Sequence, residues 1–369
     1  MRQSSRSISG NRGDSGEWLR QPRHDRCEQA DIMTIESEGY VYHCYGDEAH
    51  LRHAVASVVT LRRYDRRRAV ALYCPPTHQA LLQQHGLDSL FHVIGRLPDE
   101  ASSIVGFKHN LDKFKPFDKC LYLDSDMVWC KNPDRLWMLL APYSFTATGL
   151  NMADAYFGGP KGAGVFWDWI FNRRGTTMCQ FGLTHLPRIQ AGMIYAQDTA
   201  ATAAVCRSAA EFLAQRSKTH FRSRLNEGRK EESCEWSLAM ALSTLRMPIF
   251  PWFQGYDSPQ LDFVEGLTEY EPAFRQVVCK FYCDRFVYSL RSLANQRLRD
   301  ALLVVFSSIP GKGDFMEVTP FIIHFGSLRC KSVFSNFAAR VWRDLVDRKL
   351  EAFSGARHGE ADQQQLACA

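Results

Sequence analysis

Several features are absent from this chain of 369 residues. There is no run of 18 apolar residues, so we expect no membrane span, and no apolar segment near the N-terminus, so we expect no secretion signal. The 12 cysteines form no CxxC pair, and several lie in apolar strand candidates, which favours reduced thiols and a cytoplasmic location. A net charge of +5 is compatible with small anionic substrates and gives no support for nucleic-acid binding.

The composition predicts one large folded domain between two tails. Hydrophobic residues make up 45% of the chain, enough for a sizeable core. Residues 1–35 and 354–369 are polar and carry no apolar periodicity, so we expect both to be disordered. Met33 lies just before the first predicted strand, so translation starts there or the first 32 residues are dispensable. Residues 36–350 form the domain, with a less regular insertion at 253–320.

Strands and helices alternate in the first half of the chain, which predicts right-handed crossovers and a mostly parallel sheet. The predicted strands are 40–45, 69–74, 91–94, 120–123, 190–195, 248–252 and 321–326. The predicted helices are 47–63, 79–85, 199–213, 232–245, 285–305 and 335–350.

The most informative segment reads Cys-Leu-Tyr-Leu-Asp-Ser-Asp-Met-Val-Trp-Cys and covers residues 120–130. Asp124 and Asp126 follow a buried strand at a spacing of two residues. Two buried carboxylates need a shared partner, and Mg²⁺ or Mn²⁺ is the natural one because these ions prefer oxygen ligands. The alternative at this stage is a simple turn that ends the strand.

Two turns are predicted to meet at one edge of the sheet. In open sheets of this class, ligands bind beyond the carboxyl ends of the strands. Tyr45 and Asp47 follow the first strand, and Asp124 and Asp126 follow the fourth. The sequence therefore predicts that all four residues border a common ligand site.

The residues around this motif resemble a known family. The chain reads Lys108-His-Asn-Leu-Asp-Lys-Phe-Lys-Pro-Phe-Asp-Lys-Cys-Leu-Tyr-Leu-Asp124-Ser-Asp126, then Asn-Pro-Asp-Arg-Leu-Trp. This is similar to the DXD region of the GT-A fold glycosyltransferases, particularly family 8, and a fainter resemblance extends from about Tyr40 to His324. The resemblance implies a mixed, mostly parallel α/β sheet flanked by helices. It also implies transfer of a sugar from a nucleotide-diphosphate donor, UDP-sugar above all, to an unidentified acceptor hydroxyl, with Mn²⁺ or Mg²⁺ as cofactor and retention of configuration.

The resemblance also implies roles for individual residues. The implied metal ligands are Asp124, Asp126 and His324. The implied donor-binding residues are Tyr45, Asp47, Lys108, Asp124, Ser125, Gln190, Gly192, Gly326 and Lys331. Glu232 and Glu235, expected at a helix start, are the candidates for a carboxylate at the catalytic centre. Asp126→Asn is expected to abolish metal-dependent nucleotide binding at little cost in stability, because it removes one of two repelling carboxylates.

The chain departs from the family pattern at three positions. Gly326 comes one place early after the histidine, Lys331 comes one place late, and Arg329 is a competing cation. Gln190 stands where an asparagine is usual. These departures keep an inactive nucleotide-sugar binder open as an alternative.

Two other enzyme classes use related features. Haloacid-dehalogenase-type phosphatases carry a strand-end DxD, but on the first strand, whereas about 80 residues of α/β pattern precede the motif here. Sugar nucleotidylyltransferases have a Gly-rich loop with basic residues after the first strand, and the segment Tyr-Gly-Asp-Glu-Ala-His does not provide one.

Overall fold

The computed structural model describes residues 37–153, 157–158, 164–282, 297–298, 301–302, 305, 315–326 and 330–347. The two predicted tails therefore lie outside the described residues. Of the predicted helix 285–305, only 297–298, 301–302 and 305 are described, and these residues are helical. No helix among the described residues is long and apolar enough to cross a membrane.

The described residues build a central sheet of seven strands in the order β3-β2-β1-β4-β7-β6-β8. The strands are β1 Glu38–His43, β2 Ala69–Cys74, β3 Val93–Arg96, β4 Lys119–Leu123, β6 Phe145–Leu150, β7 Arg188–Ala196 and β8 Phe250–Pro251. All neighbouring pairs are parallel except the two that include β7, which runs antiparallel to β4 and β6. The predicted mixed, mostly parallel α/β sheet flanked by helices is confirmed.

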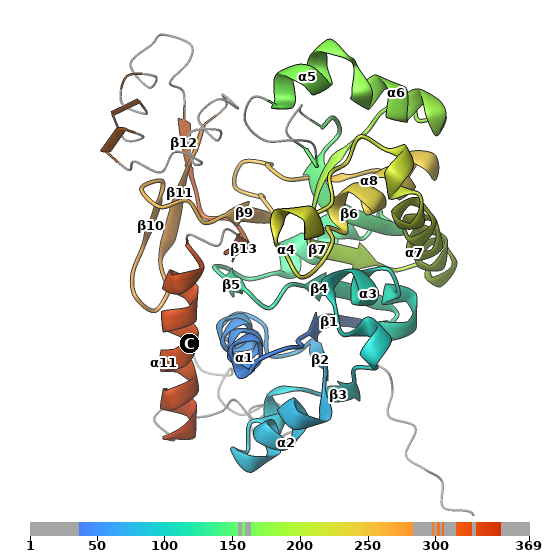
Figure 1. Ribbon diagram of the computed structural model, residues 1–369. Coiled ribbons are helices and arrows are strands. Elements are labelled where there is room, and N and C mark those ends of the chain that lie inside the picture. Colours follow the sequence, from blue (N-terminus) through green and yellow to red (C-terminus); the bar gives the residue numbers. More distant parts are fainter. Residues whose placement is uncertain are drawn as a thin grey trace, which may run out of the picture. The chain divides into compact units, whose positions relative to one another are not determined.

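Helices lie on both faces of this sheet (Figure 1). They are α1 Glu48–Arg62, α2 Pro76–Gln84, α3 Ile104–Lys108, α4 Asp134–Leu140, α5 Gly164–Ile170, α6 Arg173–Gln180, α7 Thr199–Ala214, α8 Glu235–Thr244 and α11 Lys331–Val346. Short 3₁₀ turns connect them at η1 Asp88–Leu90, η2 Asp99–Ala101, η3 Leu111–Phe114, η4 Arg216–Lys218 and η5 Leu225–Glu227.

Side chains alternate between two apolar layers along the central strands. Tyr40 and Tyr42 of β1 pack in the layer that contains α1 and α11, whereas Val41 packs in the layer that contains α7 and α8. Successive strand residues point to opposite faces, so a strand covered on both faces is apolar throughout. This explains why β1 and β4 read as continuous apolar runs in the sequence.

Two small sheets complete the described fold, and the sequence analysis predicted most of their strands as irregular. One contains β10 Thr268–Tyr270, β11 Val277–Tyr282 and β12 Phe315–Val318. The other contains β5 Met127–Trp129, β13 Ile322–His324 and β9 Gln260–Asp262, in the order β5-β13-β9. Strands β9 and β10 have only three residues each, too few to show a periodicity, whereas the six-residue β11 was missed within the aromatic-rich region predicted as irregular.

The carboxyl ends of β1 and β4 lie side by side. These strands are parallel, with Tyr42 opposite Leu123. The turns at Tyr45–Asp47 and Asp124–Asp126 therefore begin at the same edge of the sheet, as predicted. Beyond Asp126 the chain leaves the seven-stranded sheet and continues as β5. The Asp-Ser-Asp turn therefore joins the seven-stranded sheet to the small sheet of β5, β13 and β9 (Figure 1).

Candidate functional site

The Asp-Ser-Asp turn is fixed by backbone hydrogen bonds to two distant segments. The Asp124 amide donates to the Gly192 carbonyl of β7 at 2.8 Å, and the Asp126 carbonyl accepts from the Phe325 amide at 3.0 Å. Strand β5 pairs with β13, which places His324 opposite Met127. The pairing thus brings a histidine from late in the chain to the residue that follows Asp126.

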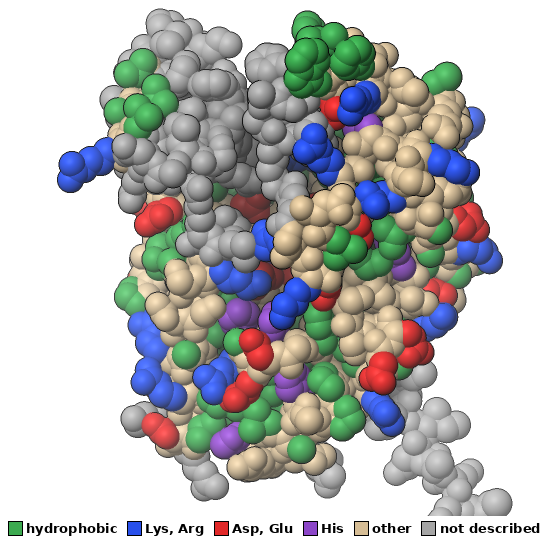
Figure 2. All heavy atoms as spheres, viewed as in Figure 1, with side chains coloured by type: hydrophobic (Ala, Val, Ile, Leu, Met, Phe, Trp, Pro, Cys, Tyr) green, Lys and Arg blue, Asp and Glu red, His purple; other side chains and the backbone are tan. Residues whose placement is uncertain are grey.

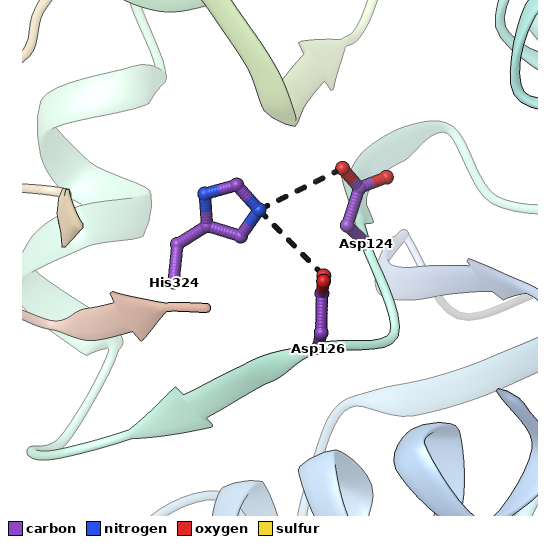
Figure 3. Close-up of side chains that lie close together, drawn as sticks. All are labelled: Asp124, Asp126 and His324. Carbon is purple, nitrogen blue, oxygen red and sulfur yellow. Dashed lines mark ion pairs between the residues drawn. The ribbon is translucent and has the colours of Figure 1, made fainter. Parts of the chain in front are cut away.

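Asp124, Asp126 and His324 converge as the sequence predicts (Figure 3). The His324 Nε2 atom lies 3.6 Å from Asp126 Oδ1 and 4.0 Å from Asp124 Oδ2. One donor atom from each residue falls within a 4.8 Å span, and Asp126 and His324 are buried. Among the described residues, this is the one group of three or more such side chains close enough to share a metal ion.

Lys108 is paired with Asp124. It lies at the end of α3 with 3% of its side chain exposed, and its Nζ is 2.8 Å from Asp124 Oδ1 and 3.1 Å from Oδ2. Burial lowers the pKa of Lys108, but the Asp124 carboxylate outweighs this and raises the pKa above its ordinary value. The Tyr122 hydroxyl donates to Asp124 Oδ1 at 2.6 Å. Asp124 is therefore held by two buried groups.

Asp126 has a cationic partner of its own. The Lys331 Nζ, at the start of α11, lies 3.2 Å from Asp126 Oδ2. Burial would raise the pKa of Asp126, but His324 and Lys331 bring it below its ordinary value. The two carboxylates are therefore neutralised separately. The expectation that Asp126→Asn would relieve repulsion has no support in this arrangement.

The buried imidazole of His324 is surrounded by acidic groups. Burial lowers its pKa, but Asp126 on one side and Asp262 on the other raise the pKa to about 10. The Gln190 amide nitrogen lies 2.7 Å from His324 Nδ1, and the Gln190 amide oxygen accepts from Gln260 at 3.0 Å. The Gln190 side chain is therefore committed to this network.

Two glycines leave room for the His324 ring. A Cβ atom on Gly326 would lie 2.5 Å from His324 Cε1, and one on Gly192 would lie 3.4 Å from His324 Nε2 and 2.7 Å from Met127 Cε. Any larger residue at 326 would push the ring away from its position. The glycine at 326 is therefore explained by the histidine ring, whereas a side chain at 192 would first displace the end of Met127.

Of the remaining predicted donor-binding residues, Tyr45 lies close enough to Asp124 for that carboxylate to contribute to the raised pKa of Tyr45, after burial and Glu231. Tyr45 donates its hydroxyl to Glu231 at 2.9 Å. Asp47 precedes α1, is exposed, and pairs with His50 Nδ1 at 2.8 Å. Ser125, between the two carboxylates, is partly exposed. On the face shown in Figure 2, histidine, acidic and basic side chains lie next to one another near the centre of the described surface.

The prediction that Glu232 starts a helix is wrong, because α8 begins at Glu235. The Glu232 carboxylate accepts from the Ser223 hydroxyl and, at 3.0 Å, from the Arg224 amide, which ties it to the preceding loop. Glu235 is the first residue of α8, and after Asp124 and Cys234 its charge makes a smaller contribution to the raised pKa of Lys108. Glu235 is thus electrostatically coupled to the Lys108–Asp124 pair.

Sequence reasoning missed four residues of this site. Tyr122 and His43 form a buried pair, with the Tyr122 hydroxyl 2.9 Å from His43 Nδ1. Glu231 accepts from Tyr45 and from the Ile104 amide, and Asp262 contacts His324. Tyr122 could have been found, since it precedes Asp124 by two residues and points to the same face of β4. The other three required the tertiary fold.

We expect acid to destabilise the protein through its buried neutral histidines. Burial lowers the pKa of His109 to about 4, and its Nε2 contacts the Ser237 hydroxyl at 3.0 Å. Between pH 6.5 and 4, the unfolded chain binds a proton at His109 that the folded protein does not. As the pH is lowered through this range, protonation of His109 in the unfolded chain therefore lowers the free energy of unfolding by up to about 1.4 kcal/mol for each pH unit.

Urea unfolding at pH 6.5 and pH 5 tests this expectation. His109→Gln keeps a hydrogen-bonding group for Ser237 and removes the titration. Its loss of stability on acidification should be smaller than that of the wild type by about 1.6 kcal/mol. Equal losses in the two proteins would contradict it.

No family model and no curated protein matches this chain. Among solved structures it is similar to mouse xyloside xylosyltransferase 1, with 12% identity over 62% of this chain and 88% of that one and a TM-score of 0.41. It is also similar to the glycosyltransferase GlyE of Streptococcus pneumoniae TIGR4, with 14% identity over 84% of this chain and 63% of that one and a TM-score of 0.43. A third similar structure is the galactosyltransferase LgtC, with 11% identity over 83% of this chain and 99% of that one and a TM-score of 0.42. These likenesses are too distant to assign an activity.

Proposed function

We propose that this protein is a metal-dependent glycosyltransferase that moves a sugar from a nucleotide-diphosphate donor to an acceptor hydroxyl. The observation that carries the proposal is the convergence of Asp124, Asp126 and His324 at the edge of the sheet where ligands of α/β proteins bind. The sequence resemblance around Asp124 supports the same assignment.

The side chains fit a divalent cation. Two carboxylates and one imidazole offer oxygen and nitrogen donors within 4.8 Å of one another. This set suits Mn²⁺, which accepts both donor types, and it also suits Mg²⁺, for which the nitrogen donor contributes less. Gly326 leaves space for the imidazole. When bound, the ion would act as a Lewis acid on the diphosphate leaving group.

The chain's own residues would orient the ligands and bind the donor. Lys108 and Tyr122 hold the Asp124 carboxylate in place from the buried side. Lys331 is partly exposed and lies beside Asp126, so its ammonium could move to the diphosphate once an ion neutralises Asp126. Of the two predicted catalytic carboxylates, we favour Glu235, because 32% of its side chain is exposed at the start of α8, whereas Glu232 is 15% exposed and bound to the preceding loop.

The finer assignments follow the family resemblance. They are a UDP-sugar as donor, Mn²⁺ as the ion, retention of anomeric configuration, and contacts from Tyr45, Asp47, Ser125 and Gly192 to the donor. A cytoplasmic location agrees with the buried thiols of Cys44, Cys74 and Cys120, which are not in disulfides.

Incubation with a panel of UDP- and GDP-sugars and Mn²⁺, followed by measurement of released nucleotide diphosphate, tests the proposal. We expect release with at least one donor, loss of release with EDTA, and none from Asp126→Asn. Pyrophosphate release would indicate a nucleotidylyltransferase instead. Free phosphate from a phosphomonoester would indicate a phosphatase. Either result would overturn the proposal.

The second candidate is a nucleotide-sugar binder without transfer activity. Gln190, at the position expected to contact the sugar, uses its amide groups on Asp262, His324 and Gln260. Saturable, Mn²⁺-dependent binding of a nucleotide sugar with no release of nucleotide diphosphate would favour this candidate.

A further inference from the structure

Asp262 lies behind the His324 ring as seen from the two carboxylates. Strands β9 and β13 are parallel, and Asp262 is the direct partner of His324 in their register. Asp262 Oδ1 lies 3.1 Å from His324 Nδ1, while Nε2 faces Asp124 and Asp126. The imidazole therefore has a carboxylate at each of its nitrogens, from different strands.

A chain of side-chain hydrogen bonds holds Asp262 in place. The Gln190 amide nitrogen donates to Asp262 Oδ1. The Gln190 oxygen accepts from Gln260 at 3.0 Å, and Gln260 also donates to Thr148 Oγ1 at 2.5 Å. Gln260 and Thr148 are buried, and Thr148 belongs to the central sheet. The position of Asp262 is thereby coupled to the rigid part of the fold.

We propose that Asp262 is a positioning residue that sets the tautomer and orientation of His324 for metal binding; this rests on the proposed function. Neutral histidine carries a proton on one nitrogen and a lone pair on the other. The Asp262 carboxylate favours a proton on Nδ1, so an ion that replaces the proton on Nε2 would meet the Nε2 lone pair on the side of Asp124 and Asp126. The Gln190 amide nitrogen lies 2.7 Å from Nδ1, but with the proton on Nδ1 it donates to Asp262 and not to the ring.

The sequence alone gives no indication of this role. Asp262 precedes His324 by about 60 residues and lies in a strand of only three residues. The carboxylate–histidine pair depends on the register of β9 against β13. Such outer partners of a histidine ligand typically change metal affinity by about 10- to 100-fold when they are removed.

Direct Mn²⁺ titration, followed by the electron paramagnetic resonance signal of the free ion, tests the proposal without requiring catalysis. Asp262→Ala should weaken Mn²⁺ binding by about 10- to 100-fold. Asp262→Asn keeps an acceptor oxygen, so its loss should be smaller. Asp257→Ala is the matched control: it removes a nearby carboxylate that pairs with Arg135 at 2.6 Å, and should bind Mn²⁺ like the wild type.

A double-mutant cycle separates positioning from a general structural effect. In a His324→Ala background, Asp262→Ala should cause no further loss of Mn²⁺ affinity, because the group it positions is gone. Mn²⁺ affinity should also fall more than Mg²⁺ affinity in Asp262→Ala, since the nitrogen ligand matters more to Mn²⁺.

The outcomes distinguish this inference from the proposed function. Wild-type protein that binds no Mn²⁺ would overturn metal dependence and this inference with it. If the wild type binds Mn²⁺ and both Asp262→Ala and Asp262→Asn bind it with the same affinity, the role of Asp262 would be overturned and the proposed function would stand. Additive losses in the double variant would also overturn it. If Asp262→Ala fails to fold, Asp262→Asn in the same cycle gives the result.

Discussion

Asp126→Asn is expected to lower Mn²⁺-dependent nucleotide-diphosphate binding by at least about 100-fold, because it removes a charged ligand from a site with three candidate ligands. The same change should lower thermal stability. It removes the anionic partner of Lys331, at 3.2 Å, and one of the carboxylates beside the buried His324 ring, at 3.6 Å. A cost on the order of 2 kcal/mol is reasonable for a lost charged hydrogen bond.

Isothermal titration with UDP and Mn²⁺, together with thermal melting of the metal-free protein, measures both effects. Asp118→Asn is a suitable control, because Asp118 is an exposed residue just before β4. It should leave binding and melting unchanged. Asp126→Asn that binds UDP and Mn²⁺ as tightly as the wild type would remove the main physical support for a metal-dependent transferase.

Lys108→Met is expected to destabilise the protein by about 3 kcal/mol, because it removes one partner of a buried ion pair. The Asp124 carboxylate would keep its hydrogen bond from Tyr122 but lose both contacts to the ammonium. Methionine has a similar length and fills the space, so the effect reports the charge and not a cavity. Metal binding should be weakened as well, because Asp124 is no longer held in one orientation.

The double variant Lys108→Met/Asp124→Asn makes this prediction sharper. Removing both partners of a buried pair costs less than removing one, so the double variant should be more stable than Lys108→Met. Urea unfolding measures the difference. Lys113→Met serves as a control, since Lys113 contacts the Asn110 side chain at the surface and should change stability by less than about 0.5 kcal/mol. A double variant less stable than Lys108→Met would contradict the pairing.

Most strands of the central sheet and the first two metal-ligand candidates could be predicted from sequence, but β6 was missed, because residues 146–190 were predicted as loops. Strand β2 was predicted with its observed bounds because it is a continuous apolar run, and helix α1 ends within one residue of the prediction because its apolar residues recur at helical spacing. Asp124 and Asp126 stand out because carboxylates after an apolar strand are costly without a partner. His324 was predicted from the family resemblance and not from spacing. Its convergence with the carboxylates depends on a pairing between distant strands.

The contacts that decide the electrostatics could not be predicted. The sequence does not show that Lys108 pairs with Asp124 and Lys331 with Asp126. Because of these pairs, Asp126→Asn is now expected to lower stability, whereas the sequence analysis expected little cost. The start of α8 was predicted three residues early, because Glu232 favours a helix by propensity but binds Ser223 and Arg224 in the fold. Tertiary contacts of this kind override local preference.

The position of His324 on β13 has a consequence for the order in which the site is made. The third candidate ligand lies about 200 residues after Asp126, and the strand that carries it must first pair with β5. Closing so long a loop is slow and depends on the folding of what lies between. A partly synthesised or cleaved chain that lacks β13 would present only the two carboxylates. A chain that binds the ion through all three side chains would then be one in which the domain, including β13, has folded.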